Sequence, residues 1–274
     1  MIKTTEQQFD LINRAFTKQS EIYDEYESSN KILHWMRQQV YEVALKYLKS
    51  KDKILELNSG TGTDAVFFAK KGFDVVATDV SDGMIEKIQN KILKEKLSDK
   101  ISVRQCSFTD LEKLYPQKFD FIFSNFGGLN CVDDLGKVTR HFPDFLNNGG
   151  RIMFVIMPPV CPWEIVQLLR GKIKFALRRF SKSGAKSNVE GVQFSTFYFS
   201  LYDFRKSLGN DFRIIHRQGL AVFTPIPQME NFPVKFPRFL KLLNRIDEKF
   251  SQYFPFNLIG DHLILVAEYN SVTI

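Results

Sequence analysis

The stretch from Ile54 to Ala65 reads ILELNSGTGTDA, and the rest of the chain is organised around it. It begins with the apolar residues of a short strand that is covered on both faces. Gly60 and Gly62 allow the backbone to turn sharply and to approach a ligand closely, because neither residue has a Cβ. A helix is predicted over residues 63–72, and a second apolar strand follows and ends on Asp79. This order of strand, glycine turn, helix, strand and acid is typical of a βαβ unit that binds a nucleoside.

Charge distinguishes between the ligands that could occupy this turn. Residues 60–65, GTGTDA, also fit the dinucleotide fingerprint, but a dinucleotide brings a pyrophosphate to the helix N-terminus. Glu56 before the turn and Asp64 in the first helical turn would repel a pyrophosphate. Both acids suit the ammonium and the sulfonium of S-adenosylmethionine (SAM), and Asp79 is placed to accept hydrogen bonds from its ribose. The alternative is an ordinary βα turn that binds no ligand and contains glycines incidentally.

The sequence ELNSGTGTDA, with ATDVSDGM at residues 77–84, closely resembles motif I and the following acidic motif of class I SAM-dependent methyltransferases. The resemblance covers residues 20–157 well and the last two strands loosely. It implies an α/β fold, a doubly wound, seven-stranded Rossmann-like sheet with an antiparallel last strand. It also implies SAM as cofactor, S-adenosylhomocysteine (SAH) as product and no metal. The cofactor contacts that it implies are Tyr23, Glu56, Asn58, Gly60, Gly62, Asp79, Val80, Met84, Ser107, Phe108, Asn125 and Phe126.

Several of these positions leave alternatives open. Ser107 stands where the family commonly has an acid that holds the adenine amino group, and Phe108 can flank the ring. Asn125 resembles the family's motif IV position, where an amide can touch SAM or substrate, although an ordinary strand-to-helix turn also fits. Tyr23 matches a segment that folds over the methionine end of SAM in related enzymes. The alternative for Tyr23 is an interface aromatic under a helix.

Residues 1–274 are interpreted as a single methyltransferase domain. Apolar residues at helical spacing predict a helical N-terminal cap over residues 1–50. Further strands are predicted at residues 101–105, 119–125, 151–156, 212–215 and 262–268. The segments 157–200 and 224–260 remain as helical and β lid insertions. Both leave the sheet from its carboxyl edge, where ligands bind in open α/β sheets, so they are expected to cover the substrate site.

The two insertions combine large apolar side chains with basic residues. A basic amphipathic helix is predicted around residues 164–180. The pattern favours a lipophilic or aromatic small-molecule acceptor and suggests contact with an anionic bilayer, at the inner face of the membrane. A satellite core with a solvated basic face is the alternative. The aromatic residues expected to line the acceptor cavity are Trp163, Phe175, Phe194, Phe232 and Phe236.

Composition restricts the function classes further. The chain has 274 residues, 44% of them hydrophobic, and a formal net charge of +7. This charge permits contact with nucleic acid or anionic lipid, but nucleic acid is disfavoured because no RNA-binding accessory domain is recognisable. The three cysteines show neither a CxxC pair nor zinc spacing, and the N-terminus lacks a signal-peptide core, which predicts a reduced, cytoplasmic setting. No apolar run reaches the roughly 18 residues of a membrane-spanning helix.

The resemblance implies transfer of the SAM methyl group to a small-molecule acceptor, in line with the departing thioether. Such a transfer needs positioning and exclusion of water, and a general base is optional. His262, at the start of the last predicted strand, is the one catalytic candidate, with a structural histidine as the alternative. Two rival functions are methylation of a macromolecule, either protein or RNA, and SAM binding without catalysis.

Overall fold

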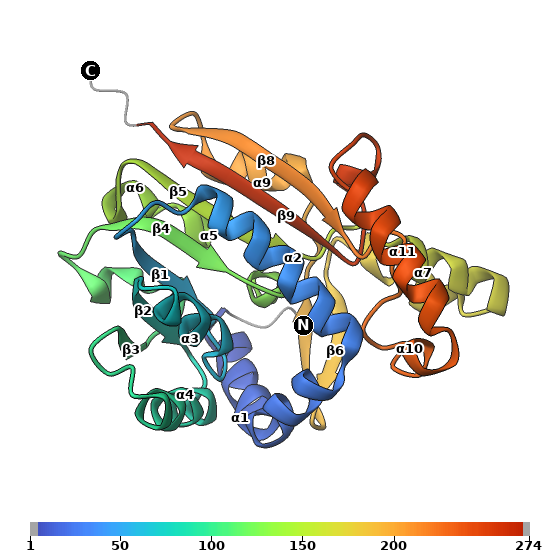
Figure 1. Cartoon of the computed structure of the whole chain (residues 1–274), viewed down its shortest axis with the longest axis horizontal. Coiled ribbons are helices and arrows are strands. Elements are labelled where there is room, and N and C mark those ends of the chain that lie inside the picture. The colour runs from blue at the N-terminus through green and yellow to red at the C-terminus, as the bar shows by residue number, and fades with distance from the viewer. Residues whose placement is uncertain (1–4, 271–274) are drawn as a thin grey trace.

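A computed structural model describes residues 5–270 and shows a central sheet with helices on both faces (Figure 1). Seven strands form the sheet in the order β3-β2-β1-β4-β5-β9-β8. Strand β9 runs antiparallel to both of its neighbours, as the resemblance implies. The strands are β1 (Lys53–Leu57), β2 (Asp74–Asp79), β3 (Ile101–Gln105), β4 (Phe119–Ser124), β5 (Leu146–Ile156), β8 (Phe212–Leu220) and β9 (His262–Tyr269).

Strand β5 begins earlier than predicted. The predicted strand starts at residue 151, yet Leu146, before the sequence NNGG at residues 147–150, already pairs with Phe119 of β4. The pairing then shifts register before Arg151, and Gly149 takes a φ of 74° within this irregularity. The glycines therefore form a bulge inside the strand, which sequence alone does not distinguish from a turn.

Helices cover the sheet and extend beyond its carboxyl edge. Asn30 separates the first two and caps the second, because its side chain accepts hydrogen bonds from the N–H groups of Ile32 and Leu33. These two helices occupy residues 5–47 of the predicted cap, and residues 1–4 and 271–274 lie outside the described part. The helices are α1 (Thr5–Ser29), α2 (Lys31–Tyr47), α3 (Thr63–Lys70), α4 (Asp82–Glu95), α5 (Gly136–Thr139), α6 (Phe142–Phe145), α7 (Pro162–Ile165), α8 (Ile173–Ala176), α9 (Leu201–Leu208), α10 (Phe232–Lys235) and α11 (Pro237–Phe250).

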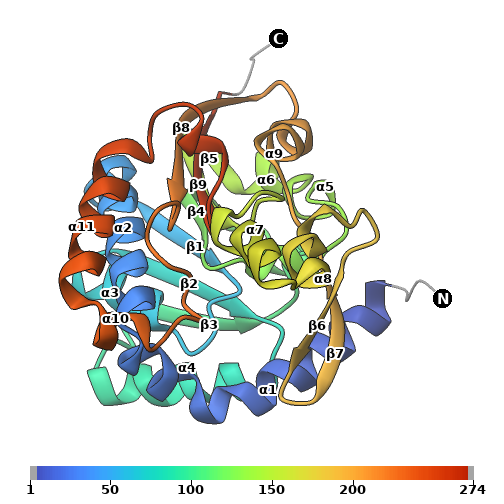
Figure 2. The ribbon, with the colours of Figure 1, turned by 90° about the vertical axis from the view of Figure 1, so that its right-hand side faces the viewer.

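The prediction of one helix around residues 164–180 is wrong. Gly171 adopts a left-handed φ of 71° and divides the segment into short pieces. These pieces are α7, α8 and the 3-10 helices η3 (Val166–Arg170) and η4 (Arg178–Phe180). A hairpin follows, formed by β6 (Ala185–Val189) and β7 (Val192–Thr196), and it lies beside α1 (Figure 2). The β part of the first insertion is therefore a pair of antiparallel strands. Other 3-10 helices are η1 (Leu111–Leu114), η2 (Gly128–Cys131) and η5 (Phe256–Leu258).

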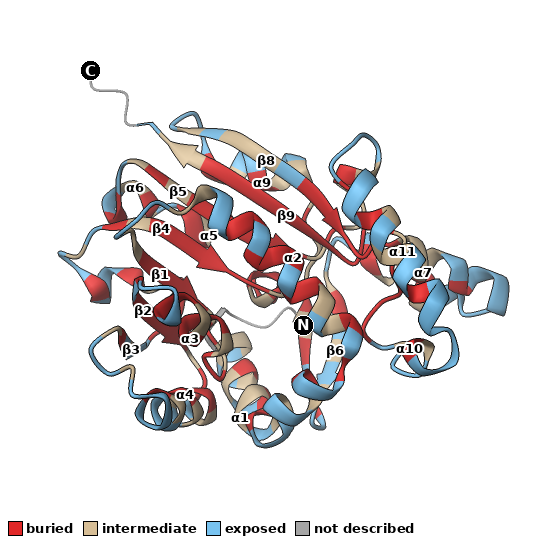
Figure 3. Ribbon diagram, in the orientation of Figure 1, coloured by how far each residue is buried: buried red, intermediate tan, exposed pale blue. Residues whose placement is uncertain are grey.

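Apolar side chains fill both faces of the sheet, and the central strands are buried along most of their length (Figure 3). One core packs α2 and α3 against the sheet, and Leu240 of α11 joins it. The other packs α1, α9 and the hairpin against the opposite face. This two-sided burial places the carboxyl ends of β1, β2 and β4 at one edge, beneath α1 and the hairpin. No helix within residues 5–270 combines the length and apolarity that crossing a bilayer requires.

Candidate functional site

The glycine turn between β1 and α3 is built from residues with positive φ. Asn58 has a φ of 50°, Gly60 of 55° and Gly62 of 80°. At Gly62 a Cβ would lie 2.3 Å from Cγ1 of Ile88 in the core, so both backbone angle and space require glycine there. At Gly60 a Cβ would meet no described atom within 4 Å, so only its φ favours glycine. Gly62 is therefore required for packing against the core, whereas Gly60 leaves one side of the turn free of side-chain atoms.

Asp79 fixes the end of β2 to this turn. One of its carboxylate oxygens accepts a hydrogen bond of 2.8 Å from the N–H of Gly60, and the other accepts one of 2.9 Å from the N–H of Ser81. The side chain is buried, and burial raises the pKa of Asp79 even though these backbone donors oppose the shift. Each oxygen retains a lone pair for a further donor. Two neighbouring hydroxyls, as on a ribose, match this pair of acceptors.

A cavity of about 300 Å³ lies against the turn, Asp79 and the end of β4. Nine of the residues predicted to bind the cofactor line it: Tyr23, Asn58, Gly60, Asp79, Val80, Met84, Phe108, Asn125 and Phe126. The structure adds Ile12 and Phe16 of α1, two of the apolar residues whose helical spacing predicts the N-terminal cap. It also adds Cys106, Cys131 and the backbone of Gly127 and Gly128. The cavity therefore joins the predicted motifs to the N-terminal helix.

Three predicted residues do not line this cavity. Gly62 packs against Ile88, and Glu56 is buried in β1 beneath the turn. The Ser107 hydroxyl lies 2.9 Å from the hydroxyl of Thr109 and accepts a hydrogen bond from the Thr109 N–H. Its hydrogen bonds thus stabilise its own loop, and the cavity wall here is formed by the neighbouring residues Cys106 and Phe108.

Arg37 of α2 is a site residue that the sequence analysis missed. It forms ion pairs with Glu27 and Asp64, and its side chain is only 7% exposed. Its guanidinium carbon lies 4.7 Å from the ring centroid of Phe126. Burial opposes the charged form, but Asp64 and Glu27 raise the pKa of Arg37 above its ordinary value. Only acids distant in sequence explain why this arginine is buried rather than exposed.

A second cavity of about 30 Å³ adjoins the main one and contacts this charged cluster. Arg37 and Asp64 line it, together with Tyr23, Asn58, Gly60, Asn125 and Phe126, which also line the main cavity. Asp64 is held in place by hydrogen bonds of 2.7 Å from the Tyr41 hydroxyl and 2.9 Å from the Asn125 amide. A guanidinium and carboxylates next to one small space suit a zwitterion with one carboxylate and one ammonium.

Glu56 lies in the same acidic environment. Burial raises the pKa of Glu56 well above its ordinary value, and the nearby Asp64 raises it further. One of its carboxylate oxygens, Oε2, is buried without a hydrogen-bond partner among the described residues. A cationic ligand next to this group would stabilise its ionised form and lower its pKa.

We therefore expect SAM binding to release a proton from Glu56. A folded-state pKa above the unfolded one means that Glu56 contributes stability below pH about 4.5, which is lost as the pH rises through the folded pKa. SAM stabilises the ionised form, so its affinity should rise with pH across that same interval. Calorimetry in buffers of different ionisation enthalpy measures the released proton. Glu56→Gln should remove the release, and an unchanged release in this variant would contradict the assignment.

His262, the catalytic candidate, is buried at the start of β9. Its Nδ1 lies 3.1 Å from the Asp261 carboxylate, and its ring packs edge-on against Phe126 at 5.7 Å. The described lining of the main cavity does not include it. Although burial works in the opposite direction, His262 and Arg179 hold the pKa of Asp261 below its usual range. This arrangement supports the alternative of a structural histidine.

Cys161, Glu164 and Asp261 present ligand atoms within 4.8 Å of one another, a grouping that can hold a metal. Here the Arg179 guanidinium lies between the two carboxylates, 2.7 Å from an oxygen of each. The positive charge at this point is therefore supplied by the protein, and Arg179 joins the segment after α7 to the start of β9.

The aromatic residues of the insertions are arranged differently from the prediction. Phe194 lines the main cavity, but the other four do not. Trp163 packs edge-on against Phe232, which in turn contacts Phe236. Phe175 lies against the guanidinium of Arg178. Trp163 of α7 and Phe232 of α10 thus belong to a separate aromatic cluster that joins the two insertions.

The seven-stranded sheet, the glycine turn and the acid that ends β2 define a class I SAM-dependent methyltransferase. Residues 54–150 match the family model described as a methyltransferase domain. SAM is accordingly the methyl donor and SAH the product.

Individual relatives are distant. The chain is 25% identical over 208 residues to malonyl-[acyl-carrier protein] O-methyltransferase 2 of Ilyobacter polytropus. The alignment covers 74% of this chain and 70% of that protein. The chain is 30% identical to demethylmenaquinone methyltransferase of Clavibacter sepedonicus, over 51% of this chain and 57% of that protein. A SAM-dependent methyltransferase structure from Clostridium acetobutylicum superimposes with a TM-score of 0.60 at 15% identity, covering 93% of this chain and 98% of that one. By their names, the first of these relatives acts on a carrier-bound acyl group and the second on a small molecule.

Proposed function

We propose that this methyltransferase acts on a small molecule bound between the SAM site and the two insertions, residues 157–200 and 224–260. One observation carries the proposal: a single cavity is lined both by the SAM motifs and by residues of the insertions. The insertion residues are Met157, Arg178, Ser187, Val189, Phe194, Thr196, Tyr198 and Gln228. A space of about 300 Å³ is in the range of small-ligand sites. It is too confined for a folded macromolecule to enter.

The proposed cofactor contacts follow from the geometry. Asp79 accepts hydrogen bonds from the ribose, and Phe108 and Met84 flank the adenine. The charged cluster of Arg37 and Asp64, with Glu56 below it, receives the methionine carboxylate and ammonium. Helix α1 contributes Tyr23 and closes the cavity from above, which is the role that we assign to the N-terminal cap.

The proposed reaction is a direct displacement. A lone pair of the acceptor attacks the methyl carbon as the carbon–sulfur bond breaks, which yields the methylated acceptor and SAH. Gly127 and Gly128 allow the backbone after β4 to lie close to the reacting atoms, and Asn125 anchors this loop through Asp64. Apolar walls formed by Ile12 and Phe16 exclude water, so rate acceleration comes from orientation in a dry site.

An untargeted methylation screen tests the proposal. The protein is incubated with isotopically labelled SAM and a cell extract that has been divided by size into a small-molecule fraction and a macromolecular fraction. Label in the small-molecule fraction is the expected result. Label confined to protein or RNA would favour methylation of a macromolecule. SAH binding without transfer to either fraction would favour SAM binding without catalysis.

We also propose that the insertions contact an anionic membrane surface. Residues 165–189 and 231–246 contain basic side chains and no acidic ones. They also expose large apolar side chains, including Leu169 at 88% and Phe239 at 50%. Trp163, just before the first segment, contacts Phe232 of the second segment, so the two segments adjoin. Exposed apolar residues among bases suit insertion at the level of anionic headgroups.

We expect the protein to co-sediment with phosphatidylglycerol vesicles and to dissociate at high salt. Leu169→Asp should weaken this binding several-fold, because it places a charge where an apolar side chain would enter the interface. Leu93→Asp is the matched control, since Leu93 is 69% exposed on α4, away from the insertions. Equal effects of the two substitutions, or no vesicle binding by the wild-type protein, would contradict the proposal.

A further inference from the structure

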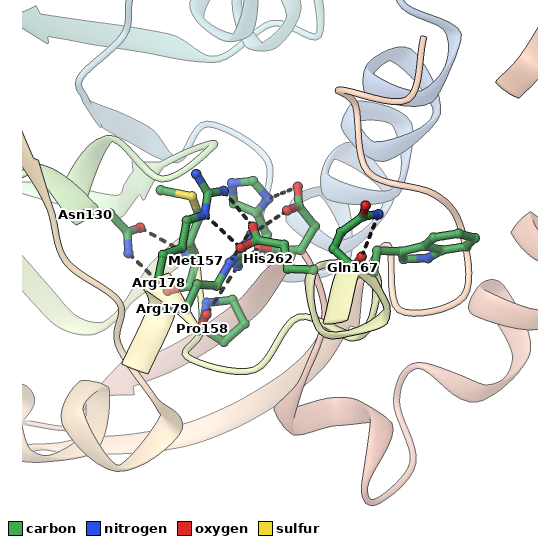
Figure 4. Close-up of polar contacts among 10 residues, drawn as sticks. Asn130, Met157, Pro158, Gln167, Arg178, Arg179 and His262 are labelled. Carbon is green, nitrogen blue, oxygen red and sulfur yellow. Dashed lines mark hydrogen bonds and ion pairs between the residues drawn. The ribbon is translucent and has the colours of Figure 1, made fainter. Parts of the chain in front are cut away.

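The end of the main cavity that the SAM motifs do not occupy contains one cation. Among the described residues that line the cavity, Arg178 is the only lysine or arginine. It lies in η4, next to Arg179, and both arginines are drawn with Met157, Pro158 and His262 in Figure 4. Asp79, at the other end, is an acid. The cavity is therefore polarised, with an acidic cofactor end and a basic end in the insertion.

Arg178 is held in a fixed orientation. Its Nε and Nη2 donate hydrogen bonds of 2.8 Å and 2.7 Å to the two oxygens of Glu164. The guanidinium carbon lies 4.4 Å from the ring centroid of Phe175, so one face of the group is covered. Among the described residues Nη1 has no hydrogen-bond partner, which leaves this donor for a ligand in the cavity. A preorganised guanidinium loses little rotational freedom when it binds.

Arg178 shares the Glu164 carboxylate with Arg179, which also pairs with Asp261, so two guanidiniums and two carboxylates form one network. Arg179 donates 2.8 Å from its Nε to Glu164 and 2.7 Å from its Nη2 to Asp261. It also donates to the backbone oxygens of Pro158 and Asp261. The buried Arg179 thereby fixes the loop in place, while Arg178, the preceding residue, lines the cavity.

Further polar groups line the cavity with Arg178. Tyr198 and Gln228 are among them, and the Ser187 and Thr196 hydroxyls lie 2.7 Å apart on the hairpin. Burial raises the pKa of Tyr198, so its phenol remains a hydrogen-bond donor at neutral pH. Phe194 and Val189 supply apolar surface on the same hairpin. A ligand suited to this part of the cavity has an oxygen-rich end and an apolar body.

We infer that Arg178 anchors a carboxylate of the methyl acceptor. The free Nη1 of Arg178 and the Tyr198 hydroxyl offer two donors to an anionic group, which corresponds to the two oxygens of a carboxylate. The acceptor class is therefore a small carboxylic acid with an apolar body, rather than a purely lipophilic molecule. Arg178 is the residue that selects it. This inference rests on the proposed function, because it assumes that the acceptor shares the cavity with SAM.

The experiment measures binding to the SAH-loaded protein. A panel of small aromatic and aliphatic carboxylic acids is titrated by ligand-observed NMR, and each acid is paired with its primary amide, which has the same shape without the charge. We expect acids of the panel to bind more tightly than their amides. Arg178→Gln should reduce that preference by about tenfold or more, because a charge-assisted hydrogen bond is replaced by a neutral one. Affinity for SAH should remain within about twofold of the wild type.

Two further variants make the result decisive. Arg170→Gln removes the same charge from an exposed residue of the neighbouring η3 and should leave the preference for acids unchanged. Arg178→Lys keeps the charge and should retain a weaker preference, which shows that a loss in Arg178→Gln is not a folding defect. The inference is overturned when no acid in the panel binds more tightly than its amide, or when Arg178→Gln and Arg170→Gln behave alike. Absence of SAH binding would instead overturn the proposed function.

Discussion

Replacing Arg37 with methionine is expected to lower the free energy of unfolding by about 3–5 kcal/mol, the typical cost of removing one partner of a buried ion pair. The substitution keeps an unbranched side chain of similar length but leaves Glu27 and Asp64 buried without a counter-charge. Burial already raises the pKa of Glu27, and Arg37 opposes that rise. Without the guanidinium the folded-state pKa of Glu27 should rise further. In the variant, the stability that Glu27 contributes should therefore be fully present below pH about 4.5 and be lost as the pH rises through its folded-state pKa.

Chemical denaturation at several pH values measures this effect. Arg213→Met is the matched control, because Arg213 also pairs with an acid, Glu268, but its side chain is 71% exposed. An exposed pair contributes at most about 1 kcal/mol, so the control should change little. The double variant Arg37→Met with Glu27→Gln should recover part of the loss by removing one of the stranded carboxylates. A loss in Arg37→Met no larger than in Arg213→Met would show that the cluster is not the buried network described above.

Replacing Asp79 with alanine is expected to weaken SAH binding by about 1–3 kcal/mol, the cost of leaving hydrogen-bonding groups unsatisfied. Two effects act together. The ribose hydroxyls lose their acceptors, and the N–H groups of Gly60 and Ser81 lose the carboxylate that fixes the glycine turn. Asp79→Asn keeps the shape and one carbonyl acceptor, so its affinity should fall between those of wild type and alanine.

Isothermal titration with SAH gives these affinities directly. Asp82→Ala serves as control, because Asp82 begins α4 three residues later and bonds to Asn13 and Gln105 outside the cavity. Its effect on SAH binding should be small. Binding of NADH in place of SAH by the wild-type protein would contradict the assignment of the turn, and equal losses in the Asp79 and Asp82 variants would contradict the role given to Asp79.

Local sequence was sufficient to predict the SAM half of the site. The turn around Gly60 and the acid at the end of β2 lie within one βαβ unit, so their spacing along the chain fixes their arrangement in space. The seven strands and the antiparallel last strand followed from the resemblance that this unit carries, whereas the strand order comes from the structure. Ser107 shows the limit of such reasoning, because a one-residue difference in orientation sends its hydroxyl to Thr109 and leaves Phe108 facing the cavity.

The acceptor half was predicted only in outline. The sequence indicated that residues 157–200 lie near the carboxyl edge of the sheet, but not which side chains enter the cavity. The left-handed residue Gly171 breaks the predicted helix and changes the direction of the chain. Trp163 and Phe175 lie outside the cavity lining, and Arg178 lies within it. A periodicity analysis cannot anticipate this change of direction, because it assumes one continuous helix.

The sequence by itself thus determined the residues that lie within one turn of the glycine motif, since short-range spacing specifies them, and the resemblance carried by that motif indicated the fold and the cofactor class. Only the tertiary structure placed Arg37 between Glu27 and Asp64, and Arg178 and Arg179 around Glu164. A buried charge is stable only when partners from other segments surround it. Whether an arginine is exposed or buried therefore depends on long-range packing, which no local pattern records.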